Sequence, residues 1–145
     1  MDSFEQRREP ATAFKSVVRP ADHTVATVFY DGSCALCRRE IDHYRKLRGS
    51  DKLRWIDIVQ DERMLAAHGL SYQTAMARLH VLGANGRWQT GVNGFVELWS
   101  HLPAYRWLAI TVRRCHLTTM LEWFYSRFAR WRMRQRCGSG SCYPV

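Results

Sequence analysis

The chain has 145 residues, a formal net charge of +9, 46% hydrophobic and 24% charged residues, and six each of Trp, Tyr and Phe. This length and composition suit one compact domain with a core rich in aromatic residues, and they exclude a largely disordered chain. No run of about 18 apolar residues is present, and Met1–His23 lacks the apolar stretch of a secretory signal, so we expect a cytoplasmic protein with reduced thiols.

The first third of the chain predicts a strand, a helix and a second strand. Val25–Tyr30 is β-branched and aromatic and ends in a cluster of turn-forming residues. From Cys34 onward, apolar residues recur at spacings of three and four, which predicts an amphipathic helix with Ser33 as its N-cap and Gly49 at its end. Leu53–Ile58 alternates as a strand that should pair in parallel with the first.

The next segment predicts a short helix, a hairpin and a longer helix. A helix over about 62–68 precedes a strand over Ala77–Leu82. Asn85-Gly86 is a preferred two-residue hairpin turn and predicts antiparallel pairing with Arg87–Thr90. The following helix should be capped by Asn93 and ended by Pro103.

Two more helices are predicted over Tyr105–Arg113 and Thr118–Arg134. One side of the second should carry its apolar residues, namely Leu121, Phe124, Tyr125, Phe128 and Trp131. We interpret the six tryptophans as packing residues and Cys115 as a partly buried small residue. The order βαβα, hairpin, helix is that of a thioredoxin-like α/β fold with a mixed sheet, so we expect such a domain over 24–134, with C-terminal helices added and flexible tails over 1–23 and 135–145.

Cys34 and Cys37 form a Cys-x-x-Cys pair where the first strand has ended and a helix begins. Unpaired N–H groups and the positive end of the helix dipole stabilise a thiolate there, so Cys34 is the candidate nucleophile. Cys37, one turn further along, is expected to be more buried, to keep a higher pKa and to act as the resolving thiol. Asp31 should organise the turn, and a role as acceptor of the Cys37 proton stays open.

The stretch Tyr30–Cys37, YDGSCALC, resembles the signature of the DCC family of predicted thiol-disulfide oxidoreductases. The likeness covers about 25–134 and includes Leu79-His80-Val81, Asn85-Gly86, Gly91–Phe95, Leu102-Pro103 and Tyr125–Arg132. It implies a thioredoxin-like fold and a protein-disulfide reductase type of activity on Cys34 and Cys37, with Asp31 as the motif's acid. No cofactor is implied beyond the Cys34/Cys37 disulfide, and the partners would be a protein or small-molecule disulfide and an electron donor. Thioredoxins place a cis-proline before the strand corresponding to Ala77–Leu82, and this chain has no Pro there.

Other functions draw on the second cysteine pair or on the basic C-terminal helix. Cys34, Cys37, Cys137 and Cys142 could supply four thiolates to a structural zinc ion. Cys137 and Cys142 could instead form a second dithiol that relays electrons to the first. A basic helix carries Arg127, Arg130, Arg132, Arg134 and Arg136 and could contact an anionic membrane surface through Phe128 and Trp131. Nucleic acid is the less favoured partner for this helix.

Overall fold

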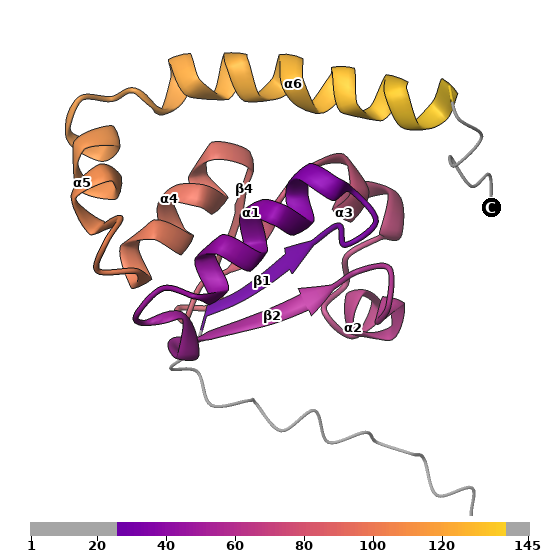
Figure 1. Ribbon diagram of the computed structural model, residues 1–145, viewed down its shortest axis with the longest axis horizontal. Helices are drawn as coiled ribbons and strands as arrows, with labels where there is room; N and C mark the ends of the chain where they lie inside the picture. The colour runs from indigo at the N-terminus through magenta and orange to yellow at the C-terminus, as the bar shows by residue number, and fades with distance from the viewer. Residues whose placement is uncertain (1–25, 139–145) are drawn as a thin grey trace, which may run out of the picture.

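The structure is a computed structural model that describes residues 26–138 (Figure 1). The segments 1–25 and 139–145 lie outside the described residues, and with them most of both predicted tails. The elements, in chain order, are β1 (Ala26–Tyr30), α1 (Ala35–Arg45), η1 (Ser50–Lys52), β2 (Leu53–Asp57), α2 (Glu62–Ala67), α3 (Tyr72–Ala77), β3 (His80–Leu82), β4 (Trp88–Thr90), α4 (Gly91–His101), α5 (Arg106–Arg114) and α6 (Thr118–Gly138).

The four strands form one mixed sheet in the order β2-β1-β3-β4. β1 and β2 are parallel, with Ala26 opposite Leu53, and β3 is antiparallel to both β1 and β4. A parallel pair linked through α1 and a hairpin linked to α4 make up the thioredoxin-like arrangement, with α5 and α6 added after it. The predicted fold class is confirmed.

Alternation along the strands gives the sheet two buried faces. Val28 and Val81 face one side, where α1 and α4 cover them with residues such as Leu98. Phe29 faces the other side and packs with Leu65 of α2. In Figure 1, α6 runs along one side of this domain, from α5 past α4 and α1 toward α3. No helix in the described part of the chain is long and apolar enough to cross a membrane.

Several predicted element ends were wrong. Cys34, not Ser33, occupies the N-cap position of α1, and the helix ends at Arg45, before Gly49 adopts a left-handed φ of 92° ahead of η1. The predicted strand over Ala77–Leu82 is only His80–Leu82, because Ala77 is the last residue of α3 and Arg78-Leu79 links that helix to the strand. Ser71 caps α3 by accepting a hydrogen bond from the N–H of Thr74 at 3.2 Å.

The N-terminus of α4 shows why Asn93 is not its cap. The helix begins two residues earlier, after Thr90, which makes no side-chain capping bond. The N–H of Val92 instead donates to Glu122 Oε2 on α6 at 3.0 Å. A carboxylate thirty residues further along the chain therefore satisfies a first-turn N–H that local side chains usually satisfy.

The outer surface also differs from the prediction. Trp107, Trp123 and Trp131 are exposed, and so is Cys115, whereas Trp55 and Trp99 pack against the core and the Trp88 ring lies against Phe29. On α6, Phe124 and Trp131 point outward with 57% and 55% of their surface exposed. The inward positions are Leu121, Tyr125, Phe128 and, one further turn along, Arg132.

Candidate active site

The turn between β1 and α1 is organised by the buried carboxylate of Asp31. Its Oδ1 accepts hydrogen bonds from the N–H of Ser33 at 3.0 Å and from the Ser33 hydroxyl at 2.7 Å. The N–H of Cys34 donates to the Asp31 carbonyl at 3.3 Å. This is an Asx turn that sets the direction in which the chain enters α1.

A second carboxylate, Asp57 at the end of β2, holds the same turn from the side. Its Oδ1 accepts the N–H of Gly32 at 3.1 Å and that of Val59 at 3.0 Å. A Cβ on Gly32 would lie 1.9 Å from Asp57 Oδ2, so no other residue fits there without displacing the carboxylate. The adjacent parallel strands β1 and β2 therefore both position the dithiol loop.

Cys34 sits at the N-cap position of α1 as a half-buried free thiol. Burial raises its pKa, but hydrogen bonds from the Cys37 thiol and the Cys37 backbone N–H outweigh that effect, and the positive charge of Arg132 adds to them. The pKa of Cys34 is therefore below the ordinary thiol value. A larger thiolate fraction at neutral pH is what a nucleophilic cysteine requires.

Cys37 lies one turn into α1 and is the more deeply buried of the two thiols. Burial raises its pKa to about 12, and the hydrogen bond with Cys34 contributes to the increase, while Arg132 opposes it. The two sulfurs, three residues apart on one helix, share a hydrogen bond and have pKa values displaced in opposite directions. Such a pair can divide the roles of attacking and resolving thiol.

Arg132 of α6 completes the surroundings of Cys37. Its Nη1 donates to Cys37 Sγ at 2.9 Å and its Nη2 donates to the carbonyl of Met76 in α3. The side chain is only 8% exposed. Arg132 therefore does not share the exposed face that the membrane-contact alternative requires of the basic helix. Its spacing of seven residues from Tyr125 was the available signal that it faces inward.

The family model of the DCC1-like thiol-disulfide oxidoreductases matches residues 28–137. The chain belongs to this family. The resemblance drawn from Tyr30–Cys37 is confirmed, and the match extends through α6 as far as the Arg132 contact. No curated protein and no solved structure matches the chain.

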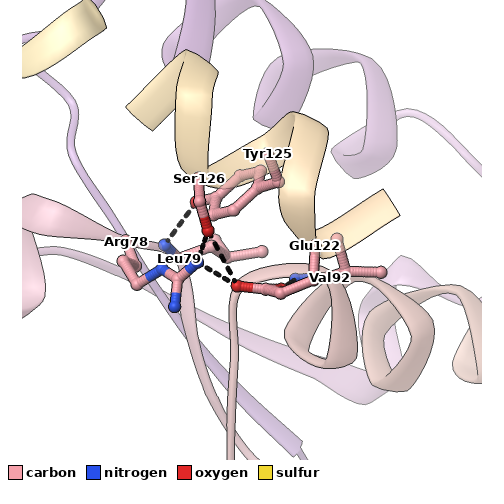
Figure 2. Close-up of polar contacts among 6 residues, drawn as sticks. All are labelled: Arg78, Leu79, Val92, Glu122, Tyr125 and Ser126. Carbon is pink, nitrogen blue, oxygen red and sulfur yellow. Dashed lines mark hydrogen bonds and ion pairs between the residues drawn. The ribbon is translucent and has the colours of Figure 1, made fainter. Parts of the chain in front are cut away.

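In this DCC1-like chain, α6 is fastened to the segment before β3 by polar contacts that we call the α6 clamp (Figure 2). Arg78 forms an ion pair with Glu122 and donates to Ser126 Oγ at 2.7 Å. The hydroxyl of Tyr125 accepts the N–H of Leu79 at 2.9 Å. All described peptide bonds are trans, and Arg78-Leu79 directly precedes β3.

A small cavity of about 40 Å³ lies beside Cys37 and is lined also by Asp31, Tyr125, Phe128 and Arg132, among others. This volume admits water molecules but no peptide. On the outer surface beside Cys34, the side chain of Leu36 is 52% exposed. The role of Asp31 as a proton acceptor stays a prediction.

The zinc and relay alternatives depend on a second cysteine pair. Cys142 lies outside the described residues, and the side chain of Cys137 does as well. Within the described part of the chain, no three or more His, Cys, Asp or Glu side chains gather as metal ligands. Both alternatives therefore stay predictions.

Proposed function

We propose that this DCC1-like protein is a thiol-disulfide oxidoreductase of the protein-disulfide reductase type, with Cys34 as nucleophile and Cys37 as resolving thiol. The observation that carries the proposal is the hydrogen-bonded sulfur pair at the start of α1. Its two pKa values are displaced in opposite directions. The family match supports the same chemistry.

The proposed reaction has two exchange steps. The Cys34 thiolate attacks one sulfur of the substrate disulfide, that disulfide breaks, and the departing thiolate takes a proton from water. Cys37 then loses its proton and attacks Cys34 Sγ in the mixed disulfide. The second substrate thiol leaves, a Cys34–Cys37 disulfide forms, and the substrate has gained two electrons. An external dithiol donor would restore the reduced pair.

Asp31 is a candidate acceptor for the proton that Cys37 loses. The carboxylate lines the same cavity as Cys37, and water in that cavity could connect them. If Asp31 has this role, Asp31→Asn slows resolution and changes its pH dependence. If Asp31→Asn resolves the mixed disulfide at the wild-type rate at every pH, Asp31 acts only on the turn.

The proposed setting is a reducing compartment such as the cytoplasm, with a protein or small-molecule disulfide as substrate. In such a compartment an accessible dithiol of ordinary potential is mostly reduced, which favours reduction of substrates over their oxidation.

The decisive experiment is differential alkylation with mass spectrometry across a glutathione redox series, with zinc measured on the same sample. We expect a reversible Cys34–Cys37 disulfide and fastest alkylation at Cys34. A pair that stays reduced and unreactive and is matched by one bound zinc would contradict the proposal. Cys115→Ser is the control, because this exposed thiol lies outside the site.

A further inference from the structure

A buried positive charge faces the dithiol from the far end of the chain. Arg132 is more than nine-tenths buried, and its hydrogen-bond partners are the Cys37 sulfur and one backbone carbonyl. No ion pair joins it to a carboxylate within residues 26–138, and its buried Nε has no hydrogen-bond partner there. Burying a charge in this way is costly unless an opposite charge forms beside it.

That opposite charge arises in the resolving step. When Cys37 loses its proton, a thiolate forms against Nη1 of Arg132, where a neutral thiol had been. The guanidinium keeps its proton throughout, and the Cys37 sulfur supplies the electron pair for the new bond to Cys34. A charge-assisted hydrogen bond to the thiolate is stronger than the one to the thiol.

We propose that Arg132 is a positioning residue that holds the Cys37 sulfur and stabilises its thiolate during resolution. The inference rests on the proposed thiol-disulfide exchange. It also gives α6 a part in the chemistry, because the α6 clamp fixes the helix on which Arg132 lies.

The test is single-turnover resolution of a Cys34–glutathione mixed disulfide, followed against pH in the full chain. Arg132→Met removes the charge, Arg132→Lys keeps it, and Arg63→Met at an exposed position of α2 is the matched control. We expect Arg132→Met to slow resolution about tenfold or more at neutral pH and to move the pH midpoint upward, since an opposite charge at this distance shifts a pKa by about 1–3 units. Arg132→Lys should recover part of the rate.

The outcomes separate this inference from the proposed function. A wild-type pH profile in Arg132→Met overturns the role of Arg132, even if that variant unfolds at a lower temperature. A wild-type protein that forms no Cys34–Cys37 disulfide overturns the proposed function and the inference together.

The outer face of α6, away from the dithiol, carries a row of exposed apolar side chains. Met120, Trp123, Phe124 and Trp131 are each between 52% and 57% exposed, and their spacing places them along one side of the helix. Monomeric proteins rarely expose large apolar side chains in a continuous row without a partner. This row, which we call the outer stripe, lies opposite the inward-facing Tyr125 and Arg132.

The outer stripe of apolar residues is flanked by basic side chains. Exposed arginines at 127, 130 and 134 lie along it, and the Arg127 guanidinium is 5.3 Å from the centre of the Trp123 ring. Residues 106–138 contain eight arginines and one acidic residue, Glu122, which is engaged by Arg78. Most of the net charge of +9 is therefore carried by the last two helices.

We infer that the outer stripe lies on the surface of an anionic bilayer. Tryptophan favours the membrane interface, and arginine can reach phosphate while neighbouring apolar groups enter the acyl boundary. Phosphates of a nucleic acid would leave Met120 and Phe124 without an apolar partner. Two-fold pairing of two copies would bring arginines against arginines.

The test is co-sedimentation of the full chain with phosphatidylcholine vesicles that contain or lack phosphatidylserine. We expect binding only with phosphatidylserine, lost at high salt, and weakened about thirtyfold in Arg127→Gln/Arg134→Gln. Trp123→Ala/Trp131→Ala should weaken it as well, and Arg63→Gln should not. Equal binding to neutral vesicles, binding to nucleic acid alone, or self-association without vesicle binding each overturns the inference.

Discussion

The two cysteines of the dithiol are controlled by different regions of the molecule. Cys34 is positioned mainly by the turn that Asp31 forms and by the start of α1, with Asp57 of β2 holding the same turn from the side. Cys37 contacts Arg132, 95 positions further along the chain, on a helix held by the α6 clamp. We therefore expect attack on a substrate to depend mainly on the turn, and resolution to depend mainly on how α6 is docked. Mutations should be able to separate the two steps.

Replacing each cysteine by serine should give the largest contrast. Cys34→Ser removes the nucleophile and should abolish reduction of a small disulfide such as oxidised glutathione. Cys37→Ser keeps the attack but cannot resolve it, so a mixed disulfide on Cys34 should accumulate and appear in the intact mass. Cys115→Ser should behave as wild type. Equal activity in wild type and Cys34→Ser would exclude the assigned roles.

The second-largest contrast should be the pH dependence of alkylation, which we expect to differ between Cys34 and Cys37. The pKa of Cys34 is lowered from the ordinary 9.0, so its reaction with iodoacetamide should reach half its maximum rate below pH 9.0. The pKa of Cys37 is about 12, so at any pH below that value its thiolate fraction is smaller and its alkylation slower. Peptide mass spectrometry over a pH series measures both rates. Coincident profiles would contradict the assignment.

Breaking the α6 clamp should affect only one of the steps. Glu122→Gln removes the charge that pairs with Arg78 and weakens the acceptor of the Val92 N–H. We expect the free energy of unfolding to fall by about 2 kcal/mol and no more, because the side chains of Arg78 and Glu122 are both partly exposed. Resolution should slow several-fold while Cys34 alkylation stays unchanged. Glu97→Gln, which breaks contacts with His101 and Arg113 instead, is the control. Denaturant unfolding and the glutathione assay test the two effects.

The smallest expected effect is that of Tyr125→Phe. The variant loses the oxygen that accepts the Leu79 N–H but keeps the ring packed against Phe95 at a centroid distance of 5.8 Å. One net hydrogen bond contributes about 1 kcal/mol. Urea unfolding should show a loss of this size. A loss above that of Glu122→Gln would reverse the order of importance within the clamp.

The sequence predicted well what neighbouring residues decide. The β1–α1–β2 unit, the Asn85-Gly86 hairpin and the position of Cys34 all follow from short-range patterns, and the structure contains them. The start of α4 was missed because Glu122, far along the chain, supplies its capping acceptor. The strand before it was predicted too long because a six-residue helix leaves little periodicity to detect.

The face of α6 was misjudged for a different reason. Its apolar residues occupy both sides of the helix, so a single inward face drawn through Phe124 and Trp131 fitted the spacing as well as the observed one through Tyr125 and Phe128. Arginine is usually a surface residue, so the membrane-contact alternative grouped Arg132 with the other arginines of the helix. Only the three-dimensional structure shows that the Arg132 guanidinium contacts the Cys37 thiol.

The contact between Gly32 and Asp57 has an evolutionary consequence. Because a methyl group on Gly32 would meet the Asp57 carboxylate, a larger residue at position 32 requires that carboxylate to leave its hydrogen bonds to the turn. In a saturation library selected for reductase activity, position 32 should return mainly glycine. If Asp57 is also replaced by a residue with a shorter side chain, small residues such as alanine should become acceptable at position 32. Related proteins would then be expected to change positions 32 and 57 together.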